Sequence, residues 1–193
     1  LLSHSPMEPV NAVVRIEGDY ADVWTGIQFP SAVPGLVSRV ADIPAENVRF
    51  HQCYLGGGFG RRGTPTHLVE ATQIAVATGK PIQLVWTRED DIQQGPFRPA
   101  SLMRIKAGVD EVGNLTAWDA ARAGGAGSSD TFRSLLPALY SWMGDGMIEG
   151  VANISEWYFE NFATDESSTE GLFEDYDHPN TRVTHMTVDH ELP

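Results

Sequence analysis

Four glycines within the five positions from Gly56 to Gly60 constrain the local fold of this chain more than any other feature. Glycine adopts backbone conformations with positive φ and lets another group approach the main chain closely. Phe59 stands inside the run, and Arg61 and Arg62 follow it directly. Bare N–H groups in such a loop form a concavity that suits anions, and guanidinium groups suit phosphate oxygens. The run therefore predicts a cofactor-binding loop in which Phe59 forms a wall against a flat or apolar group.

The glycine run matches neither of the two common nucleotide-binding motifs. In a G-x-G-x-x-G fingerprint the third glycine would stand where Arg61 is, and no acidic residue follows at the expected distance. No Gly-Lys-Ser or Gly-Lys-Thr sequence closes the run as a P-loop would. A ligand-free turn between a strand and a helix remains the alternative for a glycine triplet, but the attached Phe-Gly-Arg-Arg sequence favours a ligand.

Composition and charge exclude several classes of protein. The chain has 193 residues, of which 41% are hydrophobic and 20% charged, and this is typical of one large globular domain or two small ones. The net charge of −13 argues against nucleic acid as a partner, because phosphate backbones repel such a surface. The acidic residues concentrate in residues 140–193, where Arg182 is the only Lys or Arg, and we interpret this stretch as a solubilising face.

No metal site made of cysteine or histidine is predicted. Cys53 is the only cysteine, so the chain can form no internal disulfide and no cysteine-ligated metal or iron–sulfur site. The six histidines show no H-x-x-x-H or H-E-x-x-H spacing, and we interpret all of them as structural.

Hydrophobic periodicity predicts an α+β fold. Alternating apolar residues indicate strands, and apolar residues at helical spacing indicate two helices, the second ended by Gly79. Two antiparallel pairs argue against a doubly wound nucleotide-binding fold, so we predict a mixed sheet with helices on one face. The predicted strands cover residues 10–17, 21–25, 48–55, 82–86, 102–109, 115–122 and 181–189, and the predicted helices cover residues 31–41 and 66–78.

Local patterns add detail to this arrangement. Ser31 is the expected N-cap of the first helix. Residues 87–100 are polar and are expected to be irregular. By sequence character, the chain divides into residues 1–129, which carry the glycine run, and the acidic residues 130–193. The second helix is expected to bury Leu68, Ala71, Ile74, Ala75 and Thr78.

Several motifs in a fixed order accompany the glycine run. Together they resemble the molybdenum-binding large subunit of the xanthine dehydrogenase and aldehyde oxidase family, and within it the isoquinoline 1-oxidoreductase β-subunit type. The resemblance covers residues 1 to about 122 and implies part of a molybdopterin-binding domain. The motifs are His4-Ser5-Pro6-Met7-Glu8-Pro9, Trp24-Thr25-Gly26-Ile27-Gln28, Leu55-Gly56-Gly57-Gly58-Phe59-Gly60-Arg61-Arg62, Glu70-Ala71, Trp86-Thr87-Arg88-Glu89-Asp90-Asp91 and Phe97-Arg98-Pro99.

The resemblance implies a molybdenum hydroxylase that oxidises an N-heterocycle or an aldehyde with water as the oxygen source. It implies molybdopterin as cofactor, often in the cytosine dinucleotide form. The implied partners are the remainder of the large subunit and a small [2Fe–2S] subunit that receives the electrons, with a cytochrome c-type protein as a candidate acceptor. Family analogy places such enzymes in the periplasm or at a membrane.

The resemblance also implies roles for individual residues. Gln28 matches the glutamine near the metal. The alternative interpretation is that Gln28 is an ordinary polar residue at the end of a hairpin. Arg98 matches a substrate-side arginine, and its alternative is a surface ion pair with Glu89 or Asp90. Gly57, Gly58, Phe59 and Gly60 match the loop beneath the cofactor, where the Phe59 ring would stack on a planar substrate rather than pack in the core.

The two arginines after the loop leave two interpretations open. Arg61 and Arg62 would contact the phosphates of a dinucleotide, or they would pair with Glu70. The resemblance implies that His4 and Glu8 are structural, in an N-terminal segment that is charge-paired against the domain.

One element of the family pattern is absent from the sequence. The resemblance implies a general-base glutamate in a Gly-x-Gly-Glu setting, and no glutamate here has that context. We therefore expect a fragment that carries part of a molybdenum site and is inactive alone. The alternatives are a non-catalytic scaffold domain of the same fold that binds no cofactor, and an unrelated small anion-binding protein.

Overall fold

The computed structural model describes residues 2–125, 127–162, 168–172 and 179–188. Contacts divide the chain into two compact units, each of which combines separate stretches of sequence. The loop unit comprises residues 2–98 and 131–152, and the hairpin unit comprises the described residues of 99–130 and 153–188. Each unit therefore contains residues from both sides of the predicted boundary between residues 129 and 130.

A four-stranded mixed sheet forms the centre of the loop unit. Its strands are β2 (Asn11–Glu17), β3 (Tyr20–Thr25), β4 (Val48–Gln52) and β5 (Ile82–Val85), in the order β4-β3-β2-β5. The β3–β4 pair is parallel and the other two pairs are antiparallel. The predicted hairpin and the strand that leads into the glycine loop are therefore present, although β4 ends three residues earlier than predicted, before Cys53.

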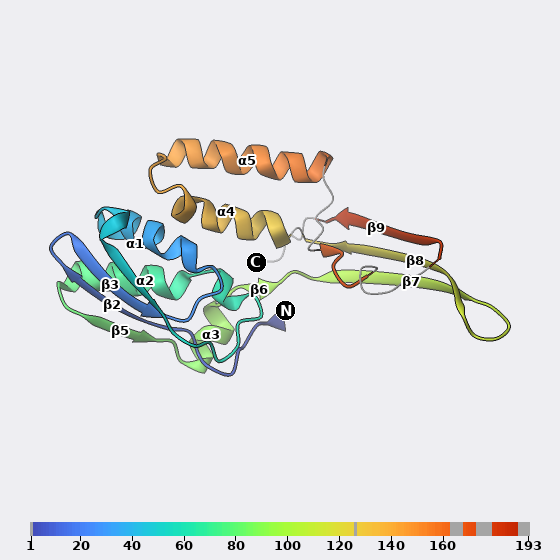
Figure 1. Cartoon of the computed structure of the whole chain (residues 1–193), viewed down its shortest axis with the longest axis horizontal. Helices are drawn as coiled ribbons and strands as arrows, with labels where there is room; N and C mark the ends of the chain where they lie inside the picture. The colour runs from blue at the N-terminus through green and yellow to red at the C-terminus, as the bar shows by residue number, and fades with distance from the viewer. Residues whose placement is uncertain (1, 126, 163–167, 173–178, 189–193) are drawn as a thin grey trace. The chain divides into compact units, whose positions relative to one another are not determined.

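Two helices cover one face of this sheet (Figure 1). Helix α1 (Val33–Ala41) and helix α2 (Thr66–Thr78) pack on the apolar positions of the strands, which alternate as a half-buried sheet requires. This arrangement gives the loop unit an α+β fold with helices on one face. The buried core contains Ala12, Val14, Ala21, Val23, Ile27, Ala32, Val33, Leu36, Val37, Ile43, Val48, Leu68, Ala71, Ala75, Leu135 and Ala138.

Two members of that core come from a distant part of the sequence. Leu135 and Ala138 belong to helix α4 (Gly127–Leu139), which is followed by helix α5 (Asp145–Asn161). The contact with α1 is so close that a Cβ atom at Gly35 would overlap the carbonyl oxygen of Ala138. Arg39 of α1 also pairs with Asp145, so this second stretch is held to the first by packing and by charge.

The ends of the predicted helices are only partly correct. The prediction of Ser31 as N-cap is wrong, because Ser31 lies in a 3₁₀ turn (Pro30–Ala32) and α1 begins after Ala32. Helix α2 has the predicted bounds and ends at Gly79, whose φ of +62° suits glycine.

The predicted buried face of α2 is partly wrong. Ile74 is 39% exposed and Thr78 is also exposed, whereas His67 and Thr72 are fully buried in their place. Thr72 satisfies its hydroxyl by donating to the carbonyl oxygen of Leu68. Polar residues that satisfy themselves locally can therefore occupy core positions that a hydrophobicity pattern assigns to apolar ones.

A short helix, α3 (Arg88–Gln94), occupies the stretch that was predicted to be irregular. Its start is fixed by a capping box, in which the Thr87 hydroxyl accepts from the Asp90 N–H and the Asp90 carboxylate accepts from the Thr87 N–H. Helix α3 leads into β6 (Phe97–Arg98), which pairs with β1 (Leu2–Ser3) and holds the N-terminal segment.

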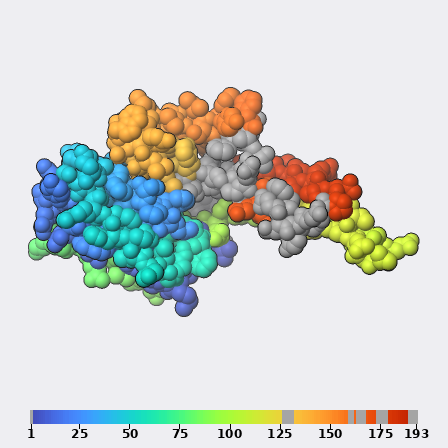
Figure 2. All heavy atoms as spheres, viewed as in Figure 1, coloured from blue at the N-terminus to red at the C-terminus, as the bar shows by residue number. Residues whose placement is uncertain are grey.

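The hairpin unit contains a three-stranded sheet. Strands β7 (Ser101–Val109) and β8 (Leu115–Gly124) form the predicted antiparallel pair, and β9 (Thr181–Thr187) runs parallel to β8. The Asp110 carboxylate accepts from the N–H groups of Val112 and Asn114, which fixes the turn at the exposed tip of the hairpin (Figure 2). The predicted residue 189 of the last strand lies outside the described residues. No helix in the described part of the chain has the length and apolar character that a membrane crossing needs.

Candidate cofactor-binding site

The glycine loop lies between β4 and α2 and presents free backbone donors. Gly57, Phe59 and Gly60 have φ values of +98°, +53° and +91°, and alternation of such conformations turns successive N–H groups toward one side. Within the described part of the chain, the N–H groups of Gly57, Gly58 and Phe59 make no hydrogen bond. Three neighbouring unpaired donors on one loop suit an anionic or oxygen-rich group.

Phe59 is exposed beside these donors. Its side chain is 65% exposed, so it is not part of the core. A Cβ atom at Gly57 would lie 2.9 Å from Cε2 of the Phe59 ring, and the ring therefore lies close over Gly57. A bulky residue with positive φ is uncommon and strained, and such strain concentrates at binding sites.

Gln28 is fixed against the same loop by its side-chain oxygen. Oε1 accepts from the Gly60 N–H at 3.0 Å, and the Gln28 backbone N–H donates to the Arg62 carbonyl at 3.1 Å. Because the backbone N–H of Gly60 is a donor, the amide oxygen must face it, and the amide nitrogen is left over. Among the described residues Nε2 has no acceptor, so it is available to a ligand.

Arg98 also contacts the loop. Its Nη2 donates to the carbonyl oxygen of Phe59 at 2.5 Å, which links strand β6 to the strained residue. This contact with a backbone carbonyl differs from the alternative interpretation, in which Arg98 forms an ion pair with Glu89 or Asp90. The structure therefore brings together Gln28, Arg98 and the predicted loop residues.

Arg61 turns away from the loop surface into the protein. Its side chain is 1% exposed, Nε donates to Asp91 Oδ1 at 2.7 Å, and the guanidinium lies 4.9 Å from the centre of the Trp86 ring. The predicted alternative pairing with Glu70 is wrong, because Glu70 instead accepts from Trp86 Nε1 at 2.7 Å.

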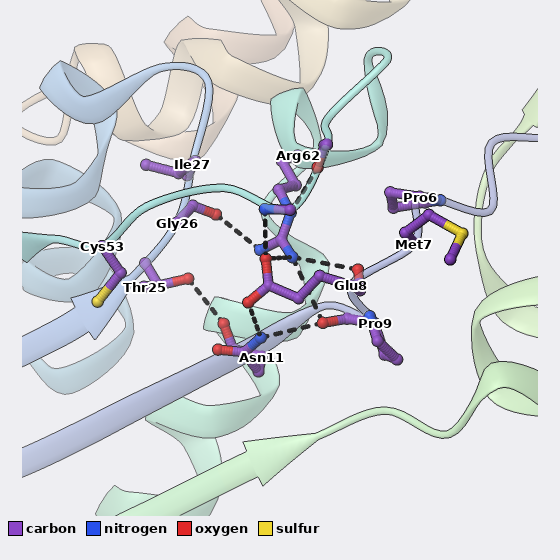
Figure 3. A network of polar contacts seen from close by, with 12 residues as sticks. Pro6, Met7, Glu8, Pro9, Asn11, Thr25, Gly26, Ile27, Cys53 and Arg62 are labelled. Carbon is purple, nitrogen blue, oxygen red and sulfur yellow. Dashed lines mark hydrogen bonds and ion pairs between the residues drawn. The ribbon is translucent and has the colours of Figure 1, made fainter.

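Arg62 is equally buried and joins three segments (Figure 3). Nε donates to the Gly57 carbonyl at 3.1 Å, Nη1 donates to the Gly26 carbonyl at 3.0 Å, and Nη2 pairs with Glu8 Oε2 at 2.7 Å. Its side chain is 0% exposed. Contact of Arg61 or Arg62 with a phosphate stays a prediction, and the burial of both side chains does not favour it.

Glu8 is charge-paired, as the resemblance implied. Oε2 also accepts from the Gly56 N–H at 2.7 Å, and Oε1 accepts from the Asn11 amide at 3.0 Å. Partial burial raises the pKa of Glu8, but the hydrogen bonds from Gly56 and Asn11 and the charge of Arg62 outweigh it and hold the pKa below its usual value. Glu8 therefore stays ionised and can anchor the loop at neutral pH.

Two histidines lie near this network. His4 Nδ1 is 2.9 Å from the Pro96 carbonyl, which can only accept, so Nδ1 carries the proton. Burial lowers the pKa of His4, and the charges of Arg98 and Arg61 lower it further. No group of three His, Cys, Asp or Glu side chains that could hold a metal ion occurs among the described residues.

His67 is a neutral histidine in the core. Burial lowers its pKa from 6.5 to about 3, with further contributions from the charges of Arg61 and Arg62. Its Nε2 lies 3.3 Å from the hydroxyl of Thr25.

The stability of the loop unit is expected to fall as the pH drops below 6.5. The unfolded chain takes up a proton on His67 near pH 6.5 but the folded chain only near pH 3, so stability that is complete above 6.5 is lost between these values. The slope from this residue approaches about 1.4 kcal/mol per pH unit. Urea denaturation at pH 7, 6 and 5 should show a shallower slope for His67→Leu than for the native chain, and parallel slopes would contradict the assignment.

Some functional contacts were not predicted. The partners of Arg61 and Arg62 are Asp91 and Glu8, which lie 30 and 54 positions away in the sequence. Glu8 was part of a quoted motif, but no local signal connects it with Arg62. Asp91 lies one turn inside a helix whose capping box could have been recognised from Thr87 and Asp90.

The fold and the site together describe an α+β domain with a loop that offers unpaired N–H donors and an exposed ring, beside an unpaired side-chain nitrogen of Gln28. Residues 2–147 match the molybdopterin cofactor-binding domain family, and the chain belongs to that family. This confirms the resemblance on which the site residues were assigned.

Relatives with known names support the same assignment. The chain is 39% identical over 112 residues to the isoquinoline 1-oxidoreductase subunit beta of Brevundimonas diminuta, covering 58% of this chain and 14% of that protein. It is 29% identical over 116 residues to the aldehyde oxidoreductase molybdenum-binding subunit PaoC of Escherichia coli K12, covering 60% of this chain and 16% of that protein.

Solved structures show the same fold. Quinoline 2-oxidoreductase from Pseudomonas putida 86 aligns with a TM-score of 0.52 at 24% identity, covering 63% of this chain and 16% of that one. Aldehyde oxidoreductase from Desulfovibrio gigas aligns with a TM-score of 0.53 at 21% identity, covering 70% of this chain and 15% of that one. The chain thus spans 14–16% of the length of these four relatives.

Proposed function

We propose that this chain forms one wall of the cofactor site in a molybdenum hydroxylase, with molybdopterin against the loop from Gly57 to Gly60. The observation that carries the proposal is the set of unpaired N–H groups at Gly57, Gly58 and Phe59 in the described part of the chain. Gln28 is bound to the same loop through its amide oxygen, and its amide nitrogen is left for a ligand. These donors fit a cofactor that is rich in oxygen and sulfur acceptors.

Glycine at position 58 makes room for the Gln28 side chain beside the loop. A Cβ atom at Gly58 would lie 2.7 Å from Gln28 Oε1, so a side chain there would displace the glutamine. The bound cofactor supplies the two-electron redox chemistry, while the protein binds and orients.

Three side chains have distinct proposed roles. Gln28 donates from Nε2 toward the metal end of the cofactor without adding charge. The exposed ring of Phe59 stacks on a planar substrate and orients it. Arg98 holds the Phe59 carbonyl and adds a positive charge that favours negative charge developing on a substrate.

The names of the relatives guide the finer proposal. We infer an N-heterocycle or an aldehyde as substrate, with water as the oxygen source and electrons passing to a [2Fe–2S] subunit. The cytosine dinucleotide form of the cofactor and a cytochrome c-type acceptor belong to the same proposal. We infer that turnover needs the remainder of the large subunit, because no glutamate in the sequence stands in the Gly-x-Gly-Glu setting that the resemblance implies for the general base, and that the isolated chain is inactive.

Metal analysis of the complete large subunit with its small subunit tests this function. Molybdenum at a near-stoichiometric level is expected, and Gln28→Leu should lower turnover about tenfold or more with little change in melting temperature, since the side chain is exposed. Gln83→Leu, at an exposed position of β5, is the matched control. Absence of molybdenum under molybdenum-replete expression would instead favour a scaffold domain that binds no cofactor.

A further inference from the structure

The two arginines at the end of the glycine loop pair with two different segments. Arg62 pairs with Glu8 of the N-terminal segment, and Arg61 pairs with Asp91 of helix α3. Both guanidinium groups are buried, and both ion pairs have N–O distances of 2.7 Å. A ligand on the loop surface therefore contacts neither guanidinium group directly. The function of the two arginines must lie in the segments that they hold together.

The two pairs belong to one closed ring of contacts. Asp91 Oδ2 accepts from Arg88 Nη1 at 3.2 Å, and Arg88 Nη2 donates to the carbonyl oxygens of Pro6 at 2.6 Å and Met7 at 3.0 Å. Pro6 and Met7 lead directly to Glu8, which returns to Arg62. We name this set the arginine ring: Glu8, Arg61, Arg62, Arg88 and Asp91, closed by the backbone of residues 6–8.

The arginine ring holds the first two residues of the glycine loop, Gly56 and Gly57. Glu8 Oε2 binds the Gly56 N–H, the Glu8 N–H donates to the Gly56 carbonyl at 3.3 Å, and Arg62 Nε holds the Gly57 carbonyl. A Cβ atom at Gly56 would lie 2.5 Å from Glu8 Cβ, so only glycine permits this approach. Fixing the carbonyls of Gly56 and Gly57 orients the two peptide groups that carry the unpaired N–H donors of Gly57 and Gly58.

Charge explains why the ring needs both carboxylates. Three guanidinium groups and two carboxylates leave one net positive charge, and adjacent buried arginines would repel each other if either carboxylate were lost. The planar guanidinium of Arg62 donates to five acceptor oxygens, on Gly26, Gly57, Glu8 and Pro9, which a lysine ammonium with three N–H groups cannot do in the same geometry.

We propose that the arginine ring is a positioning device that sets the conformation of residues 56–60 before the cofactor binds, with Glu8 and Arg62 as its positioning residues. This inference rests on the proposed function of the loop. It assigns Arg61 and Arg62 a role other than contact with phosphate.

The test compares variants of the complete large subunit with its small subunit. Glu8→Gln keeps the size of the side chain but removes its charge, and Arg62→Lys keeps the charge but removes the fork. Asp22→Asn is the control, since Asp22 binds Arg15 and Arg49 in the same unit, away from the loop. Hydrogen exchange of the peptide that spans residues 54–63 is the readout besides molybdenum content.

Exchange in this peptide is expected to be about tenfold faster in both ring variants, and molybdenum content to fall with it, while Asp22→Asn leaves both unchanged. Unchanged exchange in Glu8→Gln and Arg62→Lys would overturn the proposal, as would an equal effect of Asp22→Asn. A native enzyme without molybdenum would overturn the proposed function, and faster exchange in the ring variants would still be measurable in that case.

Discussion

Asp91→Ala is expected to lower the free energy of unfolding of the loop unit by about 3–5 kcal/mol, because it leaves a buried guanidinium without its counter-charge. The side chains of Arg61 and Asp91 are 1% and 0% exposed, so water cannot replace the lost carboxylate. The carbonyl of Thr64 and the hydroxyl of Thr66, each 3.3 Å from Arg61 Nη1, would remain as neutral partners. Urea denaturation of the purified chain, followed by tryptophan fluorescence, measures the loss.

The chain offers a matched exposed ion pair as control. Arg182 and Asp119 of the hairpin unit also have an N–O distance of 2.7 Å, but the Arg182 side chain is 71% exposed. Asp119→Ala should therefore change the stability by less than about 1 kcal/mol. Losses of equal size in the two variants would contradict the conclusion that burial, rather than pairing alone, makes Asp91 important.

Gly57→Ala is expected to reduce the turnover of the complete enzyme about a hundredfold, because small misplacements at a reacting centre have effects of this order. The new methyl group would lie 2.9 Å from Cε2 of Phe59, and the ring must move away from its position over the loop. The φ of +98° adds strain of about 1 kcal/mol for any residue with a Cβ atom.

The Gly113→Ala variant separates the effect of backbone strain from the effect of moving the Phe59 ring. Gly113 has a φ of +91° in the turn between β7 and β8, and a Cβ atom there would meet no other atom within 4 Å. Its alanine variant should lose similar stability and keep full turnover. Steady-state kinetics and melting temperatures of both variants provide the comparison, and a similar loss of turnover in Gly113→Ala would refute the assigned role of Gly57.

The elements of the fold were predictable where the local signal is strong. The strands around Gly18 and helix α2 show clear periodicity and clear ends, and they form as predicted. Helix α3 was missed because its polar residues show no apolar periodicity, although the capping box at Thr87 and Asp90 marks its start. The predicted buried face of α2 was partly wrong because His67 is buried despite its polarity. Only the tertiary structure determines the burial of that side chain.

The candidate site was predictable in position and less so in its interactions. Gln28 and Arg98 both contact the glycine run, and their roles toward a cofactor and a substrate stay predictions. The partners of Arg61 and Arg62 depend on which carboxylates the fold brings near, and spacing along the chain carries no information about them. From the sequence, Arg61 and Arg62 were assigned either to phosphate contact or to pairing with Glu70, whereas the structure buries both side chains and pairs them with Asp91 and Glu8.

Helix α4 contributes two residues to the core of the loop unit, and this affects the order in which the protein can fold during synthesis. The sheet that carries the glycine loop is complete once Val85 has left the ribosome, but Leu135 and Ala138 are still missing from its core. Contacts between such distant residues form slowly, because a long loop must close first. The cofactor loop therefore emerges on an unfinished core, and the nascent unit exposes the apolar surface around Gly35 until the intervening hairpin has been made.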